Sequence, residues 1–140
     1  MKTVLEFTNL SPDERLDFIS MQNIVAMGRA APKIVAKILF AAGEAGDYEK
    51  GEMNSYAQKA TGIELRRGLQ GTYEMVKVLR GMNQGLVPLS EQEFDIAPKF
   101  GLIKLSSIIA NSPEKVSQAC KIITSRKGVT NQIRHLAEEK

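Results

Sequence analysis

The most apolar stretch of the chain reads IVAKILFAA and spans residues 34–42. Lys37 is its only charged residue, and Pro32, just before it, suits the first turn of a helix. The stretch is too short to cross a bilayer, which takes about 20 apolar residues. It therefore predicts a helix that is buried at the centre of a folded domain.

Helical signals continue on both sides of this stretch. Ser11 and Ser90 are each followed three residues later by a glutamate that can bond back to the cap, so both should begin helices. Between breaks at glycine and proline, apolar residues recur at steps of three and four, and no useful alternating β pattern occurs. We therefore expect an all-α fold of about six to eight helices. They should cover residues 11–27, 32–42, 54–61, 64–80, a short helix from 90, 98–110, 113–125, and a last helix from 131.

Composition favours a single domain over residues 1–140. Of the 140 residues, 43% are hydrophobic and 25% are charged, which suits a chain that folds around its own core. We expect an apolar part, 1–50, that could support oligomerisation, and a basic part, 51–140. Cys120 is the only cysteine, so no disulfide can form within the chain. The first residues lack the apolar run of a signal peptide, and we expect a cytoplasmic protein without a membrane segment.

Charge is unevenly distributed along the chain. Residues 1–50 carry six Lys or Arg against seven Asp or Glu, whereas residues 51–140 carry thirteen against nine. Within the second part, residues 96–137 hold seven basic side chains and a single acidic one, Glu114. This asymmetry indicates an anionic partner for the C-terminal part, although a solvated lysine-rich surface would look similar.

The segment 54–80 has the outline of a helix-turn-helix unit, with Gly62 in the turn. A continuous helix over 64–80 would carry two stripes, because a helix turns about 100° per residue. The apolar stripe is Leu65, Leu69, Thr72, Val76 and Leu79, and the polar stripe is Arg66, Gln70, Tyr73, Lys77 and Arg80. Cations neutralise phosphates, and arginine and glutamine can read base edges, so the polar stripe is typical of a helix in the major groove. An ordinary solvated helix face is the competing interpretation, and Gly68 and Gly71 weaken the helix.

Residues 56–136 carry several short motifs in a recognisable order. YAQKATGI at 56–63 precedes the helix that ends YEMVKVL at 73–79. FGLIKL follows at 100–105, then SPE at 112–114, and KIITSRKGVTNQIRHL closes the segment at 121–136. This order resembles the helix-turn-helix region of plasmid- and phage-borne DNA-binding proteins, including ParB-type partition proteins. The resemblance implies a DNA-binding module, without the nucleotide-binding part of a partition system.

Together these patterns predict a protein that binds double-stranded DNA, such as a transcription or partition accessory factor of a mobile element. We expect one group of side chains to approach the groove and a second group to hold the backbone. The first group is Arg66, Arg67, Gln70, Tyr73, Lys77 and Arg80, and the second is Lys121, Arg126, Lys127 and Arg134.

Catalysis is not expected. With His135 as the only histidine and Cys120 as the only cysteine, the chain has no Cys/His zinc site and no Cys–His pair. Neither a phosphate-binding loop nor a dinucleotide-binding glycine motif occurs. We therefore expect no cofactor and no metal.

The alternative interpretation is a helical protein-interaction module or inhibitor. Six methionines and the apolar region 21–42 would suit a homodimer interface or a groove for a partner protein. The same residues could equally form the core.

Overall fold

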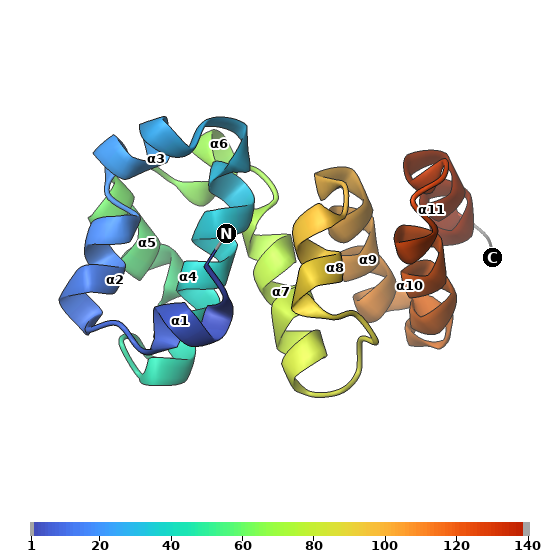
Figure 1. The fold of residues 1–140 in the computed structure, drawn as a ribbon, viewed down its shortest axis with the longest axis horizontal. Coiled ribbons are helices and arrows are strands. Elements are labelled where there is room, and N and C mark those ends of the chain that lie inside the picture. Colours follow the sequence, from blue (N-terminus) through green and yellow to red (C-terminus); the bar gives the residue numbers. More distant parts are fainter. Residues whose placement is uncertain (1, 139–140) are drawn as a thin grey trace. The chain divides into compact units, whose positions relative to one another are not determined.

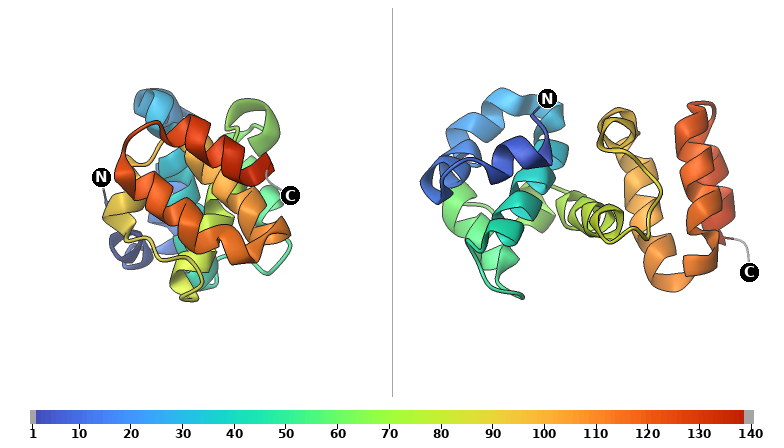
Figure 2. Two further views of the ribbon diagram at one scale, coloured as in Figure 1. Left: turned by 90° about the vertical axis from the view of Figure 1, so that its right-hand side faces the viewer. Right: turned by 60° about the horizontal axis from the view of Figure 1, so that its bottom comes forward.

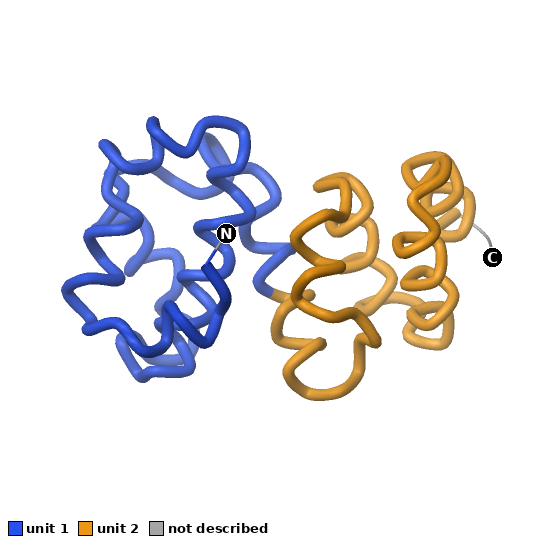
Figure 3. The backbone as a smooth tube through the Cα atoms, viewed as in Figure 1, with its two compact units in different colours: residues 1–76 blue, residues 77–140 orange. Residues whose placement is uncertain are grey.

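A computed structural model describes residues 2–138 and confirms the all-α prediction, since this part of the chain contains helices and no strand. The chain forms two compact units, Met1–Val76 and Lys77–Lys140, shown in Figure 3. The expected division at residue 50 does not coincide with this boundary, which falls inside a helix. The described residues hold more helices than the six to eight expected, because two long predicted helices are each broken in two and one short helix was not predicted.

Unit 1 is built from short helices, which Figure 1 labels. They are α1 (Val4–Thr8), α2 (Pro12–Phe18), α3 (Met21–Met27), the 3-10 turn η1 (Gly28–Ala30), α4 (Ala31–Ala45), α5 (Met53–Thr61), α6 (Leu65–Gly68) and the first turn of α7 (Thr72–Asn83). Helix α1 lies in the segment that the sequence left as a lead-in. A capping box formed by Thr3 and Glu6 begins it, as Ser11 and Glu14 begin α2.

Helix α4 is the core of unit 1, as the apolar stretch predicted. Val35, Ala36, Ile38, Leu39 and Ala41 are fully buried. Helices α1, α2, α3 and α5 pack against α4, and Figure 1 shows them around it. The apolar region therefore serves mainly as core, which was one of its two interpretations. No helix in residues 2–138 has the length and hydropathy needed to cross a membrane.

The continuous helix expected at 11–27 was wrong. Helix α2 ends at Phe18, and Ser20 adopts an extended conformation that begins α3. Ile19 between them is fully buried, and the Asn23 amide donates a hydrogen bond to the Asp17 carbonyl at 2.7 Å. Burial of Ile19 therefore decides the break, which the local helical spacing could not reveal.

The continuous helix expected at 64–80 was also wrong. Helix α6 ends at Gly68, and α7 begins at Thr72 after a bend at residues 69–71. Gly71 has a φ of +92°, which is outside the helical region and which a side chain would oppose. Buried Leu69 and Thr72 flank the bend, and the Thr72 hydroxyl donates to the Pro32 carbonyl at 3.3 Å. The turn at Gly62 is present, but the long second helix of the expected helix-turn-helix unit is not.

Unit 2 contains the rest of α7, then α8 (Glu91–Ile96), α9 (Lys99–Asn111), the 3-10 turn η2 (Pro113–Lys115), α10 (Val116–Ser125) and α11 (Val129–Glu138). Ser90 and Glu93 form the capping box that the sequence predicted. Helices α9, α10 and α11 pack against one another in pairs, and Figure 2 shows α10 and α11 running side by side in opposite directions. Gly101 on α9 permits this packing, since a Cβ there would lie 3.3 Å from a Val129 methyl group.

Candidate nucleic-acid interface

All ten side chains predicted to contact DNA are exposed. They are divided between the two units. Unit 1 holds Arg66, Arg67, Gln70 and Tyr73, and unit 2 holds Lys77, Arg80, Lys121, Arg126, Lys127 and Arg134. The predicted DNA contacts therefore fall into two groups, one in each unit, and the two groups have different neighbouring side chains.

In unit 1, the helix that was expected to carry the polar stripe is interrupted by the bend at residues 69–71, and the stripe residues around the bend line a pocket. Arg66, Gln70 and Tyr73 line one pocket of about 570 Å³, together with Glu64 and Glu74. The two carboxylates outnumber the guanidinium of Arg66 in this lining. A phosphate backbone would meet repulsion here as well as attraction, so the pocket lacks the electrostatics of a purely basic groove-reading face.

Arg67 lies outside this lining and faces an acid. Its Nε is 3.5 Å from a Glu64 carboxylate oxygen, and both side chains are exposed. An exposed pair of this kind contributes about 0–1 kcal/mol and exchanges readily with water. Arg67 therefore carries a partly compensated charge.

Helix α7 retains part of the predicted stripe. Tyr73, Lys77 and Arg80 are exposed at intervals of four and three residues, which places them on one face of the helix. Their apolar counterparts Val76 and Leu79 are buried. The division into an exposed polar face and a buried apolar face was thus predicted correctly here.

In unit 2, Lys121 lies in the middle of α10, and Arg126 and Lys127 lie in the turn to α11. Arg126 ends α10 in a left-handed conformation, with φ of +60°. The turn is held by side chains, because the Ser125 hydroxyl accepts from the Lys127 amide at 3.4 Å and the Gln132 amide donates to the Lys127 carbonyl. A short, fixed turn therefore presents two adjacent cations to solvent.

Arg134 on α11 belongs to a second cluster with α9. Its guanidinium carbon lies 5.3 Å from the centre of the Phe100 ring, and the Lys104 Nζ lies 5.5 Å from the same ring. Both are cation–π distances, so one ring holds two cations close together. Lys104 and Phe100 were not among the predicted contacts. Their spacing of four residues on one helix was the signal that could have indicated them.

The predicted contacts on α10, on the turn after it and on α11 lie in a segment with little negative charge. Within the described residues, no ion pair joins Lys121, Arg126, Lys127 or Arg134 to an acidic side chain. Glu114 is the only acid in residues 96–137, and it lies near the opposite end of α10 from Arg126. Their combined field therefore extends into solvent, where it attracts anions.

The single cysteine and the single histidine of the chain lie on different helices, α10 and α11. Cys120 is buried in α10, and burial, with a smaller contribution from the charge of Glu93, raises the pKa of its thiol to about 11. His135 is exposed on α11. Residues 2–138 contain no group of three or more His, Cys, Asp or Glu side chains placed to hold a metal ion.

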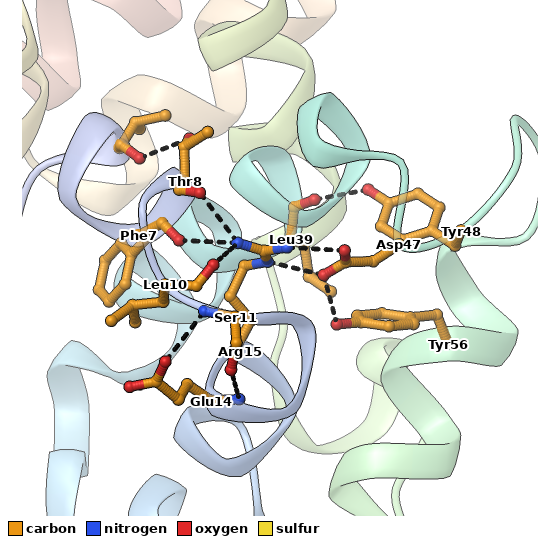
Figure 4. Close-up of polar contacts among 11 residues, drawn as sticks. Phe7, Thr8, Leu10, Ser11, Glu14, Arg15, Leu39, Asp47, Tyr48 and Tyr56 are labelled. Carbon is orange, nitrogen blue, oxygen red and sulfur yellow. Dashed lines mark hydrogen bonds and ion pairs between the residues drawn. The ribbon is translucent and has the colours of Figure 1, made fainter.

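A buried ion pair in unit 1 was not predicted. The Arg15 Nε and one terminal nitrogen donate to the two Asp47 carboxylate oxygens at 2.6 and 2.7 Å (Figure 4). The other terminal nitrogen donates to the carbonyls of Phe7, Thr8 and Leu10. The side chains of Arg15 and Asp47 are only 2% and 4% exposed. The guanidinium thus joins the end of α1 and the segment after it to Asp47, two residues beyond the end of α4, which is a structural role.

Tyr56 extends this buried network. Its hydroxyl donates to Asp47 at 3.5 Å, and its ring lies 4.9 Å from that of Tyr48. Burial, followed by the negative charge of Asp47, raises the pKa of the Tyr56 hydroxyl to about 12. The hydroxyl therefore remains a proton donor through the physiological range.

Comparisons with protein families, with curated proteins and with solved structures gave no match to this chain. The resemblance to partition-type helix-turn-helix proteins stays a prediction, and functional inference depends on the surfaces described above.

Proposed function

We propose that the protein is a DNA-binding accessory or regulatory protein and that unit 2 makes the principal contact with double-stranded DNA. One observation carries the proposal: Lys121, Arg126, Lys127 and Arg134 are exposed, and within the described residues none of them forms an ion pair with an acidic side chain. Each cation that approaches a phosphate releases counterions from the duplex, and this release drives association.

The proposed contacts are mainly to the phosphate backbone. Arg126 and Lys127 would bind at the turn between α10 and α11, Lys121 would bind from the middle of α10, and Arg134 with Lys104 would bind beside Phe100. A groove-reading role for the segment 64–80 has less support, because the bend interrupts the helix that would enter the groove. We therefore expect weak dependence on base sequence and strong dependence on salt.

A salt titration tests the proposal. The protein would be titrated with a labelled duplex at several salt concentrations, together with the triple variant Lys121→Ala/Arg126→Ala/Lys127→Ala. The slope of log K against log salt should become shallower by about 0.9 for each phosphate contact that is removed.

The matched control is Arg29→Ala/Lys50→Ala/Lys59→Ala, which removes three exposed cations from unit 1 instead. This control lowers the net charge by the same amount as the unit 2 triple variant. If unit 2 makes the contact, the control should reduce the affinity for DNA much less than the unit 2 variant does. Equal losses in the two triple variants would show a general charge effect and contradict the proposal. Absence of binding by the wild-type protein at low salt would contradict it more directly.

A second candidate function is protein interaction through α3. Met21 and Val25 lie one turn apart on this helix and are 41% and 72% exposed. Exposed apolar side chains on one helix face are typical of a contact with another protein or a second copy of the chain. Light scattering after gel filtration would test self-association, and Val25→Glu should abolish any dimer that uses this face.

A further inference from the structure

The pocket in unit 1 has the size of a small-molecule site. It lies between α5, α6, the bend at 69–71 and the start of α7, and encloses about 570 Å³. Pockets that hold small ligands usually measure about 300–1,000 Å³. Its lining comes entirely from residues 54–74, so it belongs to one unit.

The charges of the lining favour an uncharged ligand. Arg66 contributes one positive charge, and Glu64 and Glu74 contribute two negative charges. Arg67 lies 3.5 Å from Glu64 and compensates one of these. Glu74 would repel a phosphate, and Arg66 would repel an ammonium group, so an ion of either sign would meet repulsion in the pocket.

The lining is rich in carboxamides. Asn54 and Gln58 lie one turn apart on α5, and Gln70 comes from the bend. All three are exposed, and within the described part of the chain their side chains make no hydrogen bond. Each carboxamide offers a donor and an acceptor in one plane, the pairing with which asparagine and glutamine bind the edges of nucleobases.

Among the larger apolar side chains of the pocket, Tyr73 is the most exposed. It is 45% exposed, whereas Leu65 and Leu69 beneath the lining are 7% and 1% exposed. An exposed tyrosine ring is a surface on which a flat heteroaromatic ring can stack. Glu64 and Glu74 could accept hydrogen bonds from sugar hydroxyls, as acidic residues do at ribose.

We propose that this pocket binds a free, unphosphorylated nucleoside. The base stacks on Tyr73 and is read by the carboxamides, while the ribose hydroxyls meet a carboxylate. This function is separate from the proposed binding of DNA by unit 2, and either can hold without the other.

Titration of the ¹⁵N-labelled full-length protein, followed by NMR, tests the proposal. The probes are adenosine, guanosine, cytidine, uridine, ribose and adenosine monophosphate, each to millimolar concentration. At least one nucleoside should shift signals of residues 54–74 in a saturable manner, and ribose should not. If that nucleoside is adenosine, its monophosphate should bind more weakly. Tyr73→Ala should weaken binding roughly tenfold, as the loss of one stacking contact would.

Gln70→Ala should also weaken binding, while Gln118→Ala, an exposed glutamine on α10, should leave it unchanged. The same spectra report whether each variant is folded. The proposal is overturned if no nucleoside binds, if ribose binds as well as the nucleosides, or if the monophosphate binds more tightly. Unchanged affinity in both pocket variants would overturn it as well.

Discussion

Replacing Arg15 by methionine should destabilise unit 1 severely. Methionine keeps much of the aliphatic volume but removes the guanidinium, which binds the Asp47 carboxylate and the carbonyls of Phe7, Thr8 and Leu10. Asp47 would then be a buried carboxylate without its cation, a situation that costs about 3–5 kcal/mol. The buried Phe7 carbonyl would add about 1 kcal/mol. We expect a total loss of about 4–6 kcal/mol, a large part of the stability of a small domain.

Urea unfolding followed by tyrosine fluorescence suits this measurement. All three tyrosines, Tyr48, Tyr56 and Tyr73, lie in unit 1, and the chain has no tryptophan. The fluorescence signal therefore reports on unit 1 alone, whereas far-ultraviolet circular dichroism reports on both units.

Two further variants separate the contributions. Arg29→Met removes an exposed arginine from the same unit and should change the free energy of unfolding by less than about 0.5 kcal/mol. Arg15→Met/Asp47→Leu removes the unpaired carboxylate and should recover most of the loss, leaving the part due to the carbonyls. A loss below about 1 kcal/mol for Arg15→Met, the value of an exposed pair, would refute the reasoning.

Three other outcomes follow from single residues. The folded-state pKa of Tyr56, about 12, lies above its ordinary value of 10.0, so its stabilising effect should be complete below pH 10 and lost as pH rises to 12. Subtracting the absorbance titration of Tyr56→Phe from that of the wild-type protein isolates the ionisation of Tyr56, and the midpoint of this difference should lie near pH 12. A midpoint near pH 10 would contradict the prediction. Native Cys120, with a pKa of about 11 against an ordinary 9.0, should react with Ellman's reagent at pH 8 about a hundred times more slowly than in urea; equal rates would disprove its burial. Gly71→Ala should destabilise unit 1 by about 1–3 kcal/mol in the urea assay, because alanine is strained at a φ of +92°; a stabilising effect would favour the continuous helix.

The local signals in the sequence predicted much of the fold. Capping boxes at Ser11 and Ser90 began helices as expected, and the apolar stretch 34–42 became the buried helix α4. These predictions succeeded because a cap or a helical repeat depends on residues within one or two turns. The capping box at Thr3 was equally readable, and it would have indicated α1.

Exposure and burial in the segment 64–80 were predicted correctly for each residue of the two stripes, but the arrangement of these residues was not. The apolar stripe Leu65, Leu69, Thr72, Val76 and Leu79 is buried throughout, and the polar stripe is exposed throughout, although the helix that should carry both is broken. Whether a side chain is buried or exposed depends largely on its polarity, and polarity can be read from the sequence. The bend at Gly71 instead depends on packing of Leu69 and on the bond from Thr72 to Pro32, forty residues away.

By itself, the sequence determined the helical class, the excess of positive charge in residues 96–137, and the presence of a single cysteine and a single histidine. Tertiary structure alone decided that Arg66, Gln70 and Tyr73 line a pocket with two carboxylates, that Arg134 joins Lys104 at the Phe100 ring, and that Arg15 is buried against Asp47. The physical reason is distance along the chain. Composition and short-range spacing are local properties, whereas an ion pair spanning 32 residues exists only after the helices between have packed.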